Sequence, residues 1–266
     1  MTNTVRTKTT RSNTDPTRKT ALVAGILYLL TYASSIPAAL LLGETLANPD
    51  YILGAGAVGQ VRLAALFDIV NGLTAFGTAV ALYSVVKRQH QGFAIAFVTS
   101  RLFEAAILFV GILSVLAIAT LRETAANADP TSLSTVGLSL TALYKLAFTL
   151  GTGVCALNAF LLGWLMYKSR LVPRAIPVIG LIGAPLFTSW IIGYVLGITE
   201  RDTAWMAIGV APIFIWELAL GLWMTFKGFR KDAPLMVEAA AQDGSVEQPE
   251  AAPLATVGIA TKAGAA

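Results

Sequence analysis

An arginine and a glutamate lie three residues apart inside a long apolar run of this chain. The run extends from Gly92 to Leu121 and contains Arg101 and Glu104. As a helix rising 1.5 Å per residue, it is long enough to cross a hydrocarbon core of about 30 Å. A charge at the bilayer centre costs roughly 2.5–3.5 kcal/mol on insertion scales. We therefore expect a membrane helix that turns both side chains toward the protein interior or toward water, where they can also face each other.

The composition of the whole chain is typical of an integral membrane protein. Hydrophobic residues make up 56% of its 266 residues and charged residues 13%, whereas an ordinary soluble domain has about 25% charged residues. The net charge of +4 matters less than where the basic residues lie, and we expect the lipid bilayer, not nucleic acid, as partner. One cysteine, Cys155, permits no intrachain disulfide, and the single histidine, His90, has no Cys or His companion for a metal site.

Six apolar runs predict an all-α bundle of six transmembrane helices. The predicted helices cover residues 20–43, 61–86, 92–121, 138–167, 175–198 and 204–226. Asp129-Pro130-Thr131 also has the pattern of a helix start. A cleaved signal peptide is the competing interpretation of the first run, although the run exceeds the usual apolar core of about 7–15 residues. The predicted membrane domain is 19–231, between disordered cytoplasmic tails at 1–18 and 232–266.

The basic residues predict the orientation of these helices. Thirteen Lys and Arg lie in the N-terminal tail, in the turns at 87–91 and 168–174, and at 227–231. The opposite side has at most Arg62, Arg122 and Arg201. The positive-inside rule therefore predicts that both termini are cytoplasmic. We expect a multi-pass protein of the inner (plasma) membrane.

Polar residues within the predicted helices define a candidate cavity or charge cluster. Counted from the cytoplasmic ends, Arg101, Glu104, Asn158 and Glu217 lie at similar depths of roughly 14–18 Å. Farther toward the outer side are Asp68, Asn71 and Lys145. A water-filled cavity open to the outside would join the two groups. The alternative is structural: Arg101 would pair with Glu104 or Glu217, and Asp68 with Lys145 or Arg62, as interhelical clasps.

Three functions remain open on this evidence. The first is a protein that binds or carries a small molecule through the polar interhelical cavity. The second is a membrane scaffold or regulatory partner whose buried charges are purely structural. The third is an enzyme that uses Glu104 and Glu217 as acid and base. The sequence contains no Gly-x-Ser-x-Gly, no phosphate-binding glycine-rich Lys loop, no His-Glu-x-x-His and no paired histidines for haem, so we expect no metal and no cofactor.

Four segments in linked order resemble a known family of bacterial membrane proteins. They are Lys19–Tyr28, Ser100–Ala105, Tyr167–Ile176 and Trp216–Trp223. The chain resembles, over about residues 18–230, the family designated domain of unknown function 4386. The resemblance implies a six-helix bacterial membrane protein, and it carries over no activity, ligand or oligomeric state.

Overall fold

The computed structural model describes residues 16–46, 48–54, 57–125, 127–238 and 241, and these residues form helices, turns and loops without a β-strand. The helices are α1 (Pro16–Thr45), the short 3-10 helix η1 (Pro49–Leu53), α2 (Val58–Val86), α3 (Gln91–Thr124), α4 (Pro130–Ser169), α5 (Ala175–Val195) and α6 (Ala204–Phe226). All six α-helices are long and apolar enough to cross a membrane. The predicted all-α class and the six membrane helices are therefore confirmed.

Four helices begin earlier than the apolar runs indicate, and the difference is largest for α4 and α1. α4 begins at Pro130, eight residues before the apolar run, and this confirms the helix start predicted at Asp129-Pro130-Thr131. The carboxylate of Asp129 accepts the backbone N–H of Ser132 at 2.8 Å, and proline fits the first helical turn because it lacks an N–H. Hydroxyls in the next turns bond back to carbonyls, as from Thr135 to Thr131 at 3.0 Å, so polar residues continue the helix. α1 begins at Pro16, inside the predicted N-terminal tail.

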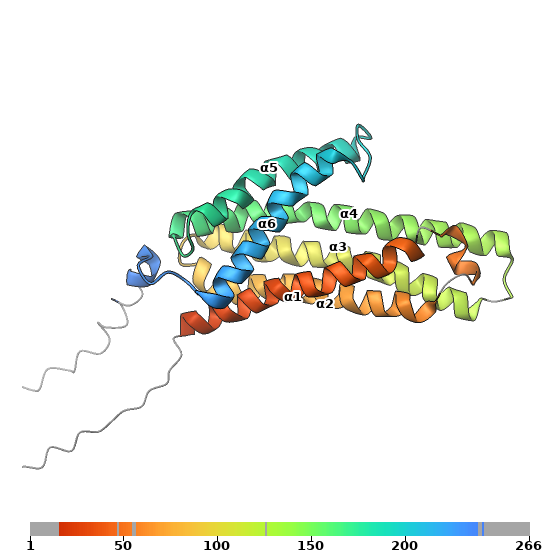
Figure 1. Ribbon diagram of the computed structural model, residues 1–266, viewed down its shortest axis with the longest axis horizontal. Coiled ribbons are helices and arrows are strands. Elements are labelled where there is room, and N and C mark those ends of the chain that lie inside the picture. Colours follow the sequence, from red (N-terminus) through yellow and green to blue (C-terminus); the bar gives the residue numbers. More distant parts are fainter. Residues whose placement is uncertain (1–15, 47, 55–56, 126, 239–240, 242–266) are drawn as a thin grey trace, which may run out of the picture.

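The six helices form a closed ring. Each α-helix packs against the next one in the chain, and α6 returns to pack against α1. One end of the bundle holds the start of α1 and the end of α6, and we call it the terminal end (Figure 1). The opposite end is covered by η1, which contacts α3 and α4, and we call it the η1 end.

Two separate apolar cores lie along the bundle. The core at the terminal end includes Phe97, Leu162 and Trp216, all buried. The core at the η1 end includes Leu42 and Ile118, also buried. Arg101, Glu104, Asn158 and Glu217 of the predicted layer are buried as well.

The hairpin of α5 and α6 diverges from the rest of the bundle. α1 and α6 approach closely near the terminal end, where a Cβ on Gly25 would lie only 2.9 Å from the carbonyl oxygen of Gly221. Farther along, the Tyr32 hydroxyl donates to the carbonyl of Phe214 at 2.7 Å. Beyond that contact the hairpin splays away from α1 and α4 (Figure 1). The ring is therefore tight at the terminal end and wider toward the α5–α6 loop.

The first residues of the predicted C-terminal tail pack against the bundle. Ala233 and Leu235 of this tail are buried, and just before it the backbone N–H of Arg230 donates to the carbonyl of Leu171 at 2.8 Å. Residues 239–240 and 242–266 of that tail, like residues 1–15, lie outside the described residues.

Candidate functional site

Arg101 is the centre of a buried charge cluster at the middle of the bundle. Only 3% of the residue is exposed. Its Nη1 donates to Glu104 Oε2 at 3.0 Å, one helical turn away on α3. Its Nη2 donates to Glu217 of α6 and to the hydroxyl of Tyr28 on α1, the latter at 3.3 Å. One guanidinium therefore ties together three helices, α1, α3 and α6.

Glu104 extends the cluster to α4. Its Oε1 accepts the thiol of Cys155 at 2.8 Å, and its Oε2 accepts the side-chain amide of Asn158 at 2.6 Å. The carbonyl oxygen of that amide in turn accepts the hydroxyl of Ser100. The predicted polar layer of Arg101, Glu104, Asn158 and Glu217 is thus assembled as one hydrogen-bonded group.

The cluster contains two carboxylates and one cation. Arg101 balances one of Glu104 and Glu217, and the rings of Tyr28 and Phe97 lie 5.6 and 6.0 Å from its guanidinium carbon. The Nε of Arg101 is buried and has no hydrogen-bond partner among the described residues. The guanidinium of Arg101 therefore keeps one N–H group that no described side chain or carbonyl accepts.

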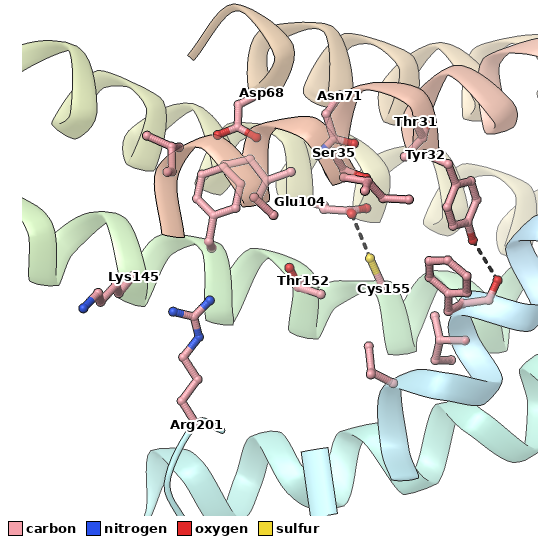
Figure 2. A pocket seen from close by; sticks show the side chains of 18 of the residues that line it. Thr31, Tyr32, Ser35, Asp68, Asn71, Glu104, Lys145, Thr152, Cys155 and Arg201 are labelled. Carbon is pink, nitrogen blue, oxygen red and sulfur yellow. Dashed lines mark hydrogen bonds between the residues drawn. The ribbon is translucent and has the colours of Figure 1, made fainter. Parts of the chain in front are cut away.

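A cavity of about 870 Å³ adjoins the cluster. Figure 2 shows polar side chains directed into it from α1, α2, α3, α4 and the α5–α6 loop. Its polar lining consists of Thr31, Tyr32, Ser35, Asp68, Asn71, Arg101, Glu104, Tyr144, Lys145, Thr152, Cys155, Tyr194, Arg201, Asp202 and Glu217. Apolar side chains complete the wall, among them Leu42, Leu108 and Phe148. Such a volume and mixture of groups are typical of sites for small organic molecules.

Asp68 is a buried acid in the lining, and one of its two carboxylate oxygens has no partner among the described residues. Only 3% of the residue is exposed, and this oxygen is Oδ2. The predicted clasp of Asp68 with Arg62 or Lys145 is not present. Arg62 instead pairs with Glu123 at 2.6 Å on the exposed surface of α2 and α3, and Lys145 forms no ion pair among the described residues but lines the cavity. The clasp was wrong because depth alone does not fix the rotation of a helix.

One family model matches this chain over residues 23–228 and is described as Domain of unknown function (DUF4386). The chain belongs to this family. The predicted resemblance is therefore confirmed, and it covers nearly the predicted span. No curated protein and no solved structure matches the chain.

The matched region of this DUF4386 protein contains every residue of the cluster and every residue that lines the cavity. Asn71 lies one turn beyond Asp68 and lines the cavity with it. All seven predicted site residues thus adjoin the cavity or the cluster, with Asn158 behind Glu104.

Sequence reasoning missed several members of the site. Tyr28 is an aromatic residue in an apolar run, and nothing in its spacing separates it from lipid-facing residues. Tyr144 on α4 likewise has no sequence signal that separates it from lipid-facing residues. Arg201 and Asp202 belong to a loop outside the predicted helices, yet both line the cavity because α5 and α6 are much shorter than α4. The sequence signal for this loop was that the last two apolar runs are shorter than the fourth, so that the loop between them could lie within the depth of the bundle.

Proposed function

We propose that this membrane protein binds a small molecule in the cavity between its helices. The observation that carries the proposal is the juxtaposition of an 870 Å³ space with the buried polar groups of Asp68, Arg101, Glu104 and Glu217. Two buried polar atoms of these residues, Asp68 Oδ2 and Arg101 Nε, have no hydrogen-bond partner among the described residues, and burying such atoms is costly. A bound molecule with matching donors and acceptors would satisfy these atoms.

The proposal includes an orientation. The excess of basic residues at the terminal end supports cytoplasmic termini in a bacterial inner (plasma) membrane. At that end Lys168 lies over the ring of Trp164 and Arg174 over that of Tyr167, at 6.0 and 4.9 Å, an arrangement suited to a membrane–water interface. In this orientation the wider side of the cavity, near the α5–α6 loop, opens toward the outer side.

A second candidate is a scaffold whose charge cluster is structural. The observation in its favour is that both oxygens of Glu104 already accept hydrogen bonds from protein groups. The same observation weakens the enzyme hypothesis, because an acid or base needs an oxygen free to reach a substrate. Neither candidate accounts for the unpartnered Oδ2 of Asp68.

Cysteine accessibility separates the binder from the scaffold. The native cysteine is first removed as Cys155→Ala, and single cysteines are then introduced on α4. Thr152→Cys places a thiol on the cavity wall, and Leu157→Cys places one on a side that is 50% exposed outside the cavity. A membrane-impermeant thiol reagent applied to the outer side of intact cells is expected to label the first variant and leave the second unlabelled.

The same variant provides a binding assay. Molecules that occupy the cavity are expected to slow the labelling of Thr152→Cys, because they cover the thiol. Equal resistance of both cysteines to the reagent would contradict a water-accessible cavity and favour the scaffold. Labelling of Thr152→Cys only from the side of the termini would contradict the proposed orientation.

A further inference from the structure

We propose that the cavity takes an organic ammonium ion with an apolar body, and that the carboxylate of Asp68 holds its charged group. This inference rests on the proposed function and specifies the chemical class of the molecule. It starts from the position of Asp68, which lies on α2 in the wall of the cavity (Figure 2).

The carboxylate of Asp68 has no cation among the described residues. Arg62 is paired with Glu123, and Arg101 is shared by Glu104 and Glu217. The other cations of the lining, Lys145 and Arg201, form no ion pair with Asp68. A buried charge pair is strongly destabilised when one partner is absent, so a cationic molecule in the cavity would gain a partner in the Asp68 carboxylate.

The lining of the cavity has one more acid than it has cations: it contains four acids, Asp68, Glu104, Asp202 and Glu217, and three cations, Arg101, Lys145 and Arg201. The cluster of Arg101, Glu104 and Glu217 contains one cation against two carboxylates. Asp68 adds a further carboxylate. The field inside the cavity therefore favours a positive over a negative ligand.

A metal ion suits the surroundings of Asp68 poorly. Calcium takes six to eight oxygen ligands and zinc about four N, S or O ligands. The described residues contain no group of three or more His, Cys, Asp and Glu placed to hold a metal. An ammonium group needs a single carboxylate and tolerates aromatic neighbours.

Aromatic and aliphatic side chains of the lining suit the body of such a molecule. Tyr144 and Phe148 on α4 pack together with ring centroids 4.5 Å apart, and both line the cavity. Leu42, Leu46 and Leu108 lie along the same wall. An aliphatic or aromatic amine would bury its apolar atoms against these side chains and direct its charge to Asp68.

Three isosteric probes test the inference on the full-length protein purified in detergent. They are 2-phenylethylamine, the neutral 2-phenylethanol and the anionic 3-phenylpropionate. We expect the amine to raise the melting temperature, since a ligand of the native state stabilises it, and to bind at least roughly tenfold more tightly than either isostere. Equal binding of the amine and the alcohol, or no binding of the amine, would overturn the inference.

Matched Asp→Asn variants test whether the carboxylate of Asp68 is the group that binds the ammonium ion. Asp68→Asn keeps the shape of the side chain and is expected to abolish the preference for the amine. Asp232→Asn makes the same change at an exposed position outside the cavity and is expected to bind the amine like the wild type. Asp68→Glu, which retains the charge, is expected to keep the preference. An unchanged preference in Asp68→Asn contradicts the inference, and the wild-type comparison of amine and alcohol stands even if this variant does not fold.

The two proposals fail in different ways. Strong binding of the alcohol, together with labelling of Thr152→Cys, rejects the ammonium class and leaves the binding cavity intact. Resistance of Thr152→Cys to labelling rejects the cavity as a binding site, and the ammonium class falls with it.

Discussion

Arg101 on α3 and Glu217 on α6 form an ion pair although 116 positions separate them in the sequence. Glu104 competes for the same guanidinium. The pair is therefore one part of a three-charge cluster. The three members of this cluster do not contribute equally to its charge balance. Arg101 is the only cation in the cluster, whereas either carboxylate leaves a neutral pair behind when it is removed.

This inequality predicts an asymmetric response to mutation. Arg101→Leu leaves two buried carboxylates without a cation, so we expect a loss of about 3–5 kcal/mol of stability. Glu217→Gln keeps Arg101 paired with Glu104, so we expect a clearly smaller loss. The double variant Arg101→Leu/Glu217→Leu is expected to recover only part of the loss, because Glu104 remains unpaired. Thermal melting in detergent and membrane abundance measure all three.

Two results would contradict this account of the cluster. Equal destabilisation by Glu217→Gln and Arg101→Leu would mean that Glu104 does not compensate the arginine. Wild-type melting of all three variants would mean that the charges are hydrated from the cavity and need no partner. The second result would strengthen the case for a wet binding site.

The apolar pattern predicted most of the fold because length and hydrophobicity alone decide whether a helix crosses a membrane. It placed α6 at its observed bounds, Ala204–Phe226. It failed at the start of α4, where Thr and Ser hydroxyls bond to carbonyls of the same helix and let polar residues continue it. That information lies in local hydrogen bonding and not in hydropathy.

The sequence predicted which residues belong to the site better than it predicted which of them contact each other. Counting 1.5 Å per residue brought Arg101, Asn158 and Glu217 to one depth, and the structure places them in one cluster. The same counting suggested partners for Asp68 that it does not have. Depth follows from chain position, whereas a contact also needs the rotation of each helix and the splay of α5 and α6, which depend on packing of the whole ring.

The close approach of α1 and α6 predicts an intolerant glycine. A Cβ on Gly25 would lie 2.6 Å from the backbone nitrogen of Thr225 and 2.9 Å from the carbonyl oxygen of Gly221. Backbone atoms cannot move away as a flexible side chain can, so Gly25→Ala is expected to separate the helices and lower the melting temperature. Gly43→Ala, on the same helix with no atom within 4 Å of its added Cβ, is the control and is expected to be neutral or slightly stabilising. Similar melting of the two variants would contradict this packing.

Arg18 forms a second contact that holds α1 to α6, and its removal is expected to destabilise the protein. Its guanidinium donates to the carbonyl of Met224 at 2.8 Å and to that of Thr225 at 2.7 Å, at the last turn of α6. These carbonyls have no partner within the helix, and a cation there also favours the helix dipole. Arg18→Ala is expected to cost about 1.5–3 kcal/mol, measured by thermal melting, and Lys19→Ala at an exposed neighbouring position to cost little. A larger effect of the Lys19 variant would show that general charge at the terminus, and not this contact, matters.

Asp129 predicts a pH-dependent start of α4. At 1.5 Å per residue this 40-residue helix is about 60 Å long, so its first turns project beyond a hydrocarbon core of about 30 Å. The backbone N–H and the hydroxyl of Ser132 donate to the Asp129 carboxylate and hold its pKa below the usual range. A lowered pKa means that the cap is complete above the usual value of about 3.9 and is lost as the pH falls through the lower folded value.

Hydrogen exchange at residues 131–134 tests this cap. We expect their protection factors in the wild type to be constant from about pH 7 down to about pH 4 and to fall below that, as the carboxylate becomes protonated. Asp129→Asn is expected to keep protection across the whole range, because asparagine caps helices and does not titrate there. Asp129→Ala is expected to lose protection at every pH. Wild-type protection in the Ala variant would show that Pro130 alone starts the helix, since a proline in the first turn has its backbone already set for helical geometry.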